Sequence, residues 1–459
     1  MAPTLTFLGG AGTVTGSKFL LRHAGGALLV EAGLFQGLRP LRRRNWEPLP
    51  VDPATLDAVV LTHAHLDHCG YLPALGRQGL DAPVLATRST IRLAELVLRD
   101  SAKLQEEDAA FAARGGWSRH AQPEPLYTAA DVERVLPRMR EVPFGDRVTA
   151  APGTALTLRP AGHILGSATA LVEVDGTRIL FSGDLGRPGH PLLVDPAPPP
   201  AADVVVVEST YGDRRHGGGA DEQLADVVRR TVDRGGVVLV PAFAVDRTEV
   251  LLMSLRRLLV AGAVPDVPVY VDSPMALGAL RVYRQALVEG GTDIRPGIED
   301  GLAVFERGNL HEVHTAAESR TLNDPGFPCI IVSASGMGTG GRVVHHLESL
   351  LPDPRNSVVL VGYQAVGTRG RDLAEGAGQL KMHGRYVRVR AEVAVVDGFS
   401  VHADADEVLA WLGSAPAPPR AVYVVHGEPA ASAALAGRIR AELDWLAVTP
   451  WDGERVRLD

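Results

Sequence analysis

At residues 62–68 the chain reads Thr62-His63-Ala64-His65-Leu66-Asp67-His68, directly after the apolar run from Leu56 to Leu61. Such a run is typical of a buried strand, whose end would deliver three histidines and an aspartate together at a sheet edge. The spacing of His63 and His65 suits one metal ion, while Asp67 and His68 can reach a second. Imidazole and carboxylate together indicate zinc or a similar divalent transition metal. A histidine-rich surface loop is the alternative, and the density and placement of the motif disfavour it.

Further candidate ligands lie elsewhere in the chain, each just past a strand-like run and close to glycine or serine. The backbone can bend at such positions, so side chains from separate strands can converge there. These residues are His163, Asp184 and His402. Cys69 adjoins the first motif, and we interpret it as a small buried residue because the ligand set is complete without it.

Taken in order, these motifs resemble the metallo-β-lactamase fold. Later segments resemble its β-CASP branch, which processes nucleic acids, and the resemblance runs from Phe7 to Glu428. The chain is similar to the prokaryotic β-CASP ribonucleases and to the endonuclease subunit of the cleavage and polyadenylation machinery. The segments that carry the β-CASP resemblance are Glu208-Ser209-Thr210-Tyr211-Gly212, Ser335-Gly336-Met337 with Gly340-Gly341-Arg342, Gly362-Tyr363-Gln364 with Gly367-Thr368, and Phe399-Ser400-Val401-His402-Ala403.

The resemblance implies roles for individual residues. One metal ion would be held by His63, His65 and His163, and the other by Asp67, His68 and His402. Asp184 would bridge the two ions, and Glu208 would orient a general acid. Substrate contacts would come from Ser335, Gly336 and Arg342. The residues expected to take part in catalysis are Asp67, Asp184, Glu208, His402 and His426.

Two positions depart from the family pattern. Asp372 stands where the eukaryotic relative has a histidine after the Gly-Tyr-x-x-x-Gly-Thr segment, which leaves the general acid open. His426 is the preferred candidate because it follows a strand, and the other histidines considered are His345, His346 and His383. Glu31 stands where the family usually has an aspartate that supports the metal loop.

The expected fold class is α/β, a metallo-β-lactamase αββα sandwich with an inserted α/β domain built on a parallel sheet. The predicted boundaries place the first part of the sandwich at residues 1–205, the β-CASP domain at 206–375 and the second part of the sandwich at 376–459. A long helix is predicted from Ile91 to about Ala112, and further helices over 221–233 and 247–260. Short β-branched strands alternate with helices after residue 200, which is typical of a parallel sheet covered on both faces.

Composition agrees with an enzyme of the cytoplasm. The chain has 459 residues, of which 46% are hydrophobic, enough for more than one core. Its two cysteines provide no disulfide framework, and no apolar stretch reaches the length of about 20 residues that spans a bilayer, so no membrane association is expected. The net charge of −8 is low for a nucleic-acid enzyme, which implies local contacts to the substrate. Oligomeric state is left open between a monomer and a homodimer.

The expected function is hydrolysis of RNA phosphodiester bonds by a hydroxide held between two zinc ions, with manganese as the other metal considered. An endonucleolytic mode is favoured over a 5′-to-3′ exonucleolytic one. His402 favours RNA, because the DNA-repair members of the family carry valine at that position. One alternative is a dinuclear metallohydrolase of small esters or lactones. The other is an inactive scaffold that binds RNA.

Overall fold

The computed structural model describes residues 2–115, 122–298 and 309–458. These residues form two compact units, one comprising residues 1–215 with 402–459 and the other comprising residues 216–401. The sequence-based boundaries at 205 and 375 stay a prediction about the family domains. None of the described helices is both long and apolar enough to cross a bilayer.

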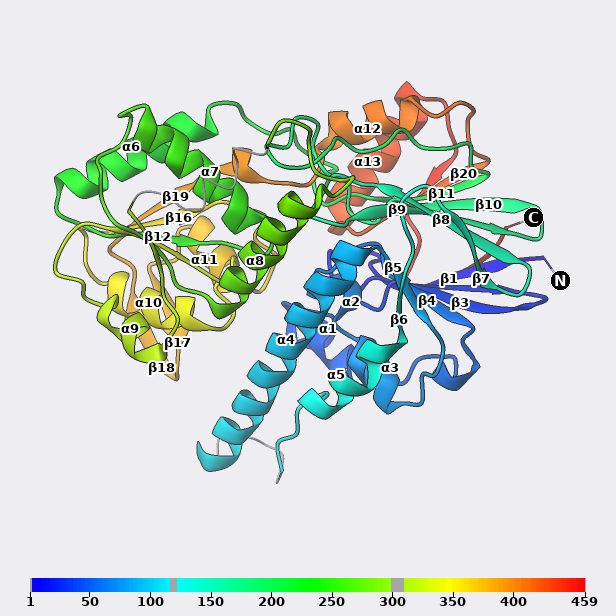
Figure 1. Cartoon of the computed structure of the whole chain (residues 1–459), viewed down its shortest axis with the longest axis horizontal. Coiled ribbons are helices and arrows are strands. Elements are labelled where there is room, and N and C mark those ends of the chain that lie inside the picture. Colours follow the sequence, from blue (N-terminus) through cyan, green and yellow to red (C-terminus); the bar gives the residue numbers. More distant parts are fainter. Residues whose placement is uncertain (1, 116–121, 299–308, 459) are drawn as a thin grey trace. The chain divides into compact units, whose positions relative to one another are not determined.

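The first unit is built on two mixed sheets that pack face to face (Figure 1). One sheet has the order β22-β1-β2-β3-β4-β5-β6 and the other has the order β21-β20-β11-β10-β9-β8-β7. Alternating apolar side chains of both sheets meet in a shared core that contains Leu5, Phe7, Phe19, Leu156 and Phe181. The strands are β1 (Thr4–Gly9), β2 (Lys18–His23), β3 (Gly26–Val30), β4 (Ala58–Val60), β5 (Val84–Ala86), β6 (Met139–Glu141), β7 (Arg147–Ala151), β8 (Thr154–Pro160), β9 (Ala168–Val174), β10 (Thr177–Phe181), β11 (Val204–Glu208), β20 (Ala421–Val425), β21 (Ala447–Val448) and β22 (Arg455–Arg457).

Helices cover the outer faces of this sandwich, so the expected αββα arrangement is confirmed. The helix predicted from Ile91 to about Ala112 is α4 (Arg88–Gly115). The second sheet is covered by α12 (Ala405–Gly413) and α13 (Pro429–Glu442), which bury Trp411, Leu435 and Ile439 against it. The remaining helices of the unit are α1 (Arg39–Arg44), η1 (Pro53–Thr55), α2 (Leu66–Cys69), α3 (Leu72–Arg77), α5 (Ala129–Val135) and η2 (Leu136–Arg138).

The second unit contains a sheet of order β14-β13-β15-β12-β16-β19, in which every neighbouring pair is parallel, as predicted for the inserted domain. Its strands are β12 (Val238–Pro241), β13 (Val269–Val271), β14 (Leu310–Glu312), β15 (Ile330–Ser333), β16 (Ser357–Leu360) and β19 (Glu392–Val395). A separate antiparallel hairpin is formed by β17 (Gln379–Met382) and β18 (Arg385–Arg388).

Helices follow the strands of this parallel sheet, and the helices predicted over 221–233 and 247–260 are α6 (Ala220–Asp233) and α7 (Arg247–Val260). One face of the sheet shares a core with α10 (Arg342–Leu350) and with the hairpin. This core includes Leu239, Ile331, Leu347, Leu380 and Met382. The remaining helices are α8 (Pro274–Glu289), α9 (Ala316–Thr321), α10 (Arg342–Leu350), α11 (Arg369–Ala374) and η4 (Asp397–Phe399).

Candidate metal centre

The histidine-rich motif occupies the loop after β4, and its last residues open the short helix α2. Further polar side chains follow other strands of the first unit. They come from the segments after β8, β10 and β20, from the last residue of β11, and from the segment between Phe399 and Ala405. Because these strands are neighbours within the sandwich, residues far apart in the sequence meet at one edge. They are His63, His65, Asp67, His68, His163, Asp184, Glu208, His402 and His426.

A first group of ligand atoms belongs to His63, His65, His163 and Asp184, and all of them lie within 4.8 Å of one another. Nδ1 of His65 lies 3.2 Å from Nε2 of His63 and 3.3 Å from Nε2 of His163. Oδ2 of Asp184 lies 3.4 Å from Nε2 of His63 and 3.7 Å from Nε2 of His163. Three imidazoles and one carboxylate are a ligand set that suits zinc.

A second group consists of Asp67, His68 and His426. Nε2 of His426 lies 3.1 Å from Nε2 of His68 and 3.5 Å from Oδ2 of Asp67. Asp184 faces this group with its other oxygen, because Oδ1 lies 3.3 Å from Nε2 of His68 and 3.4 Å from Nδ1 of His426. The two oxygens of Asp184 therefore point to two different sets of ligands, as a bridging carboxylate requires.

The geometry differs from the sequence-based assignment of His402 to this second group. Nδ1 of His402 lies 3.2 Å from Oε1 of Glu208 and 3.9 Å from Oδ2 of Asp184. His402 forms an isolated bridge with Gly186, beside the loop that carries Asp184. His426 instead leaves β20, which pairs in parallel with β11, and this strand position delivers it to His68. The group with Asp67 and His68 thus contains His426 in place of His402.

Glu208 is held rigidly beside His402. Its Oε1 accepts a hydrogen bond of 2.8 Å from the amide of Leu185, and its Oε2 accepts one of 3.1 Å from the amide of Thr210. The side chain of His402 is 13% exposed, whereas that of Glu208 is only 1% exposed. A buried carboxylate therefore fixes the orientation of an imidazole that reaches solvent, as expected for a residue that acts on a substrate.

Hydroxyl groups orient two of the histidines, and these contacts were not anticipated from the sequence. Oγ1 of Thr62 lies 3.1 Å from Nδ1 of His63, and Oγ1 of Thr210 lies 3.1 Å from Nδ1 of His426. Such contacts to the second ring nitrogen fix the tautomer and direction of a metal-binding imidazole. The available signal was the threonine directly before His63, whereas Thr210 and His426 are brought together only by the pairing of β11 with β20.

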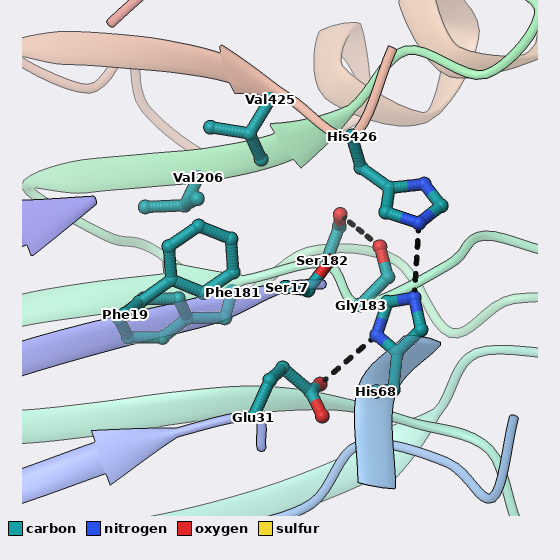
Figure 2. Close-up of a pocket in the computed structure, with 10 residues that line it drawn as sticks. All are labelled: Ser17, Phe19, Glu31, His68, Phe181, Ser182, Gly183, Val206, Val425 and His426. Atoms are coloured by element: carbon teal, nitrogen blue, oxygen red, sulfur yellow. Dashed lines mark hydrogen bonds and ion pairs between the residues drawn. The ribbon is translucent and has the colours of Figure 1, made fainter. Parts of the chain in front are cut away.

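Glu31 supports the motif from inside the sandwich, as Figure 2 shows. Its Oε1 accepts a hydrogen bond of 3.2 Å from the amide of Thr62 and lies 3.6 Å from Nδ1 of His68. Burial raises the pKa of Glu31. Glu31 and His426 both have a positive φ, 65° and 50°, a conformation that is uncommon for residues other than glycine and that clusters at functional sites.

Burial controls the electrostatics of the first group. It lowers the pKa of His63 to about 3 and that of His65 to about 4, and it holds the pKa of His163 well below its ordinary value. These imidazoles are therefore neutral near pH 7, which is the form that binds metal ions. For Asp184 burial acts to raise the pKa, but the charges of His426 and His68 outweigh it and hold the pKa well below the usual range. The donor set fits divalent transition-metal ions.

A narrow pocket extends behind His68 and His426 into the interior of the sandwich (Figure 2). Phe19, Phe181, Val206 and Val425 give it an apolar inner wall, and His68 and His426 border it. The pocket is lined by Ser17, Phe19, Glu31, His68, Phe181, Ser182, Gly183, Val206, Val425 and His426.

The predicted substrate-binding residues Ser335, Gly336 and Arg342 belong to the second unit, and their role towards RNA stays a prediction. Within that unit the guanidinium of Arg342 lies 2.6 Å from Oδ1 of Asp272 and donates hydrogen bonds of 3.0 Å to the carbonyls of Val313 and His314. Asp272 also contacts His346, one of the general-acid alternatives, at 2.6 Å. Arg342 and His346 thus fix the loops around α10.

The close approach of Gly33 to the metal loop leads to a stability prediction. A Cβ atom at Gly33 would lie 1.7 Å from the carbonyl oxygen of Asp67, so Gly33→Ala must displace the loop. We expect it to destabilise the protein by about 1–3 kcal/mol and to lower its metal content. Gly437→Ala, in α13, is the matched control, because nothing lies within 4 Å of its Cβ and alanine favours helix by about 0.5–1 kcal/mol. Equal melting temperatures for the two variants would contradict this account of Gly33.

Three family models match the chain. The Metallo-beta-lactamase superfamily matches residues 11–240, the Beta-Casp domain matches 248–373, and the Zn-dependent metallo-hydrolase RNA specificity domain matches 386–450. Among curated proteins, the chain is 37% identical to ribonuclease TTHA0252 of Thermus thermophilus over 92% of both chains. It is 33% identical to transcription termination factor FttA of Pyrococcus horikoshii, over 88% of this chain and 62% of that protein.

Among solved structures, a protein of unknown function from Enterococcus faecalis matches with a TM-score of 0.53 and 14% identity, over 100% of both chains. A likeness at this level of identity supports the fold alone.

Proposed function

The chain belongs to the metallo-β-lactamase superfamily and carries its Beta-Casp domain and RNA specificity domain, and from this premise we propose that it hydrolyses phosphodiester bonds of RNA. The observation that carries the proposal is the position of Asp184, whose oxygens face two separate groups of metal ligands. The name of the Thermus thermophilus relative, a ribonuclease similar over 92% of both chains, supports RNA as the substrate.

Two zinc ions are the proposed cofactors, with manganese as the alternative. His63, His65 and His163 would hold one ion, Asp67, His68 and His426 would hold the other, and Asp184 would contact both. This assignment replaces the sequence-based one, in which His402 took the place of His426. The chemistry supplied by such a pair is activation of water near neutral pH and neutralisation of charge on the phosphoryl oxygens.

Because His402 is not among the metal ligands in this assignment, we propose that it acts as the general acid. With Nδ1 held by Glu208, Nε2 is the nitrogen that would give its proton to the departing 3′-oxygen of RNA. Glu208 would stabilise the protonated imidazole and keep its ring in place, as a carboxylate does beside a catalytic histidine. His426, our preferred acid from the sequence, is 5% exposed and contacts Asp67 and His68, which favours a ligand role.

We propose an endonucleolytic mode in the cytoplasm, as the sequence led us to expect. The chain spans about 62% of the length of FttA, the transcription termination factor of Pyrococcus horikoshii. The alternatives are a hydrolase of small esters and an inactive scaffold. The complete ligand set and the Glu208–His402 pair favour an active nuclease over the scaffold.

The test uses the purified full chain with single-stranded RNA that carries either a 5′-phosphate or a blocked 5′ end. We expect internal cleavage of both RNAs, loss of cleavage after treatment with a chelator, and recovery when zinc or manganese is returned. Metal content and molar mass in solution, measured on the same sample, give the number of ions and separate a monomer from a homodimer. Hydrolysis of a generic ester without any cleavage of RNA would overturn the proposal, and so would intact RNA binding by a chain that takes up no metal.

A further inference from the structure

A second group of metal-ligating side chains lies within the second unit, and neither the family models nor the proposed reaction assigns it a role. It consists of His345, Glu348 and His383, which each offer one ligand atom within 4.8 Å of the others. All three are described residues on the surface of the unit, where His345 and His383 are exposed and Glu348 is half-buried. Two imidazoles and one carboxylate on adjoining elements are a recurrent ligand set for zinc.

The helix α10 places the first two ligands on one face. His345 and Glu348 are three residues apart, so their side chains are neighbours on the helix surface. The opposite face of α10 is buried, with Val344 and Leu347 in the core of the unit. The buried face fixes the rotation of the helix, so His345 and Glu348 stay on its outer face.

The third ligand comes from the turn of the β17–β18 hairpin. His383 and Gly384 are the two residues between these strands, and both have a positive φ, of 46° and 80°. Asparagine and glycine are the usual residues in such a turn, because most other residues are strained at a positive φ. The turn geometry alone therefore does not account for a histidine at this position. Leu380 and Met382 anchor β17 in the same core as α10, which fixes the hairpin relative to the helix.

The side chains of the helix and of the hairpin turn are already in contact. The rings of His345 and His383 stack with centroids 4.6 Å apart and an angle of 25° between their planes, and Nδ1 of His383 lies 2.8 Å from Oε2 of Glu348. Ligand atoms bound to one tetrahedral zinc ion at about 2.0–2.1 Å are about 3.4 Å apart. The ligand atoms of this group lie within 4.8 Å of one another, so they would close on an ion by rotation of the side chains.

We propose that His345, Glu348 and His383 bind one divalent transition-metal ion of the zinc class, which ties the β17–β18 hairpin to α10. Water would complete the coordination, since three protein ligands leave a position open. An ion held by elements that already pack together stabilises the folded unit, because it binds the folded chain and not the unfolded one. The site is independent of the ligands assigned to the reaction.

The experiment compares bound metal in the full chain and in variants after equilibration with zinc and removal of the excess. His383→Asn is the principal variant, since asparagine tolerates a positive φ and keeps the turn. Glu348→Gln keeps the size of the side chain and its contact with His383 but removes the charge. His314→Asn is the matched control, because His314 is in the same unit and its side chain is 61% exposed.

We expect His383→Asn to contain one zinc ion fewer per chain than the wild type, and His314→Asn to contain the same number. Glu348→Gln should weaken this site at least about tenfold, because even residues outside the first coordination sphere matter by 10–100-fold. Cobalt in place of zinc should show a visible absorption component that is lost in His383→Asn. The test compares the zinc content of each variant with that of the wild type, so its outcome does not depend on how many ions the metal centre of the first unit holds.

Identical metal content and identical zinc-induced rises in melting temperature for the wild type, His383→Asn and Glu348→Gln would overturn the proposal. Circular dichroism checks that each variant is folded. If His383→Asn fails to fold, Glu348→Gln alone decides, because its surface position and unchanged size leave the fold intact. A chain that cleaves no RNA but loses one ion in His383→Asn would refute the proposed function and support this site.

Discussion

Asp184→Asn is expected to abolish RNA cleavage and to lower the metal content of the protein by at least one ion per chain. The two oxygens of Asp184 face different ligand groups, 3.4 Å from Nε2 of His63 and 3.3 Å from Nε2 of His68. Asparagine keeps one of these oxygens but turns an NH₂ group towards the other site and removes the negative charge. The cleavage rate should fall by about 10³-fold or more, as when one member of an integrated active site is removed.

The matched control for this substitution is Asp175→Asn. Asp175 lies in the turn between β9 and β10, the strand that leads to Asp184, and its φ of 49° is one that asparagine tolerates. This control should cleave RNA and bind metal like the wild type. If Asp184→Asn kept both ions and its activity, the bridging role would be wrong, and the two groups would have to work as separate sites.

Much of this centre could be predicted from the sequence, because local patterns encode it. The motif from His63 to His68 follows a buried strand, and His163 and Asp184 stand just past strand ends in the same way. Strand ends of one sandwich gather at a common edge, so the convergence of these residues follows from the fold. Glu31 is a departure from the aspartate usual in the family, and the structure shows that it nevertheless contacts the amide of Thr62 and the ring of His68.

The exchange of His402 and His426 shows what local patterns do not encode. Both histidines follow strand-like runs near the end of the chain, and nothing in their immediate sequence indicates which of them lies beside Asp67 and His68. Their positions are decided by long-range pairing. β20 lies beside β11 and brings His426 to Asp67 and His68, whereas the bridge to Gly186 holds His402 beside Glu208.

The family resemblance implies that Arg342 contacts the substrate, and in the sequence Arg342 directly follows Gly340 and Gly341. The structure adds a buried partner, Asp272, that comes from the end of β13 and contacts Arg342, His346 and Ser319. A carboxylate buried without such partners would be costly, so part of the role of Arg342 is structural. If Arg342 binds RNA, it must do so while its guanidinium stays in contact with Asp272.

The second large effect is expected from His402→Ala, which should lose RNA cleavage while retaining its metal ions. Loss of a general acid slows cleavage by about 10²–10⁴-fold. We expect the metal content to be unchanged, because His402 groups with Asp184 and Glu208, and not with His63 or His68, whose groups are assigned to the ions. His426→Ala should behave differently and lose metal together with activity, because its Nε2 lies 3.1 Å from that of His68.

The contact between His402 and Glu208 predicts how substitutions of the two residues combine. If Glu208 acts by orienting His402, then Glu208→Gln should slow cleavage less than His402→Ala, and the double variant should be no slower than His402→Ala alone. An RNA with a leaving group that needs no proton should restore much of the rate to His402→Ala and none to Asp184→Asn. Metal loss in His402→Ala, with full metal retention in His426→Ala, would return His402 to the ligand role and reverse the assignment made from the geometry.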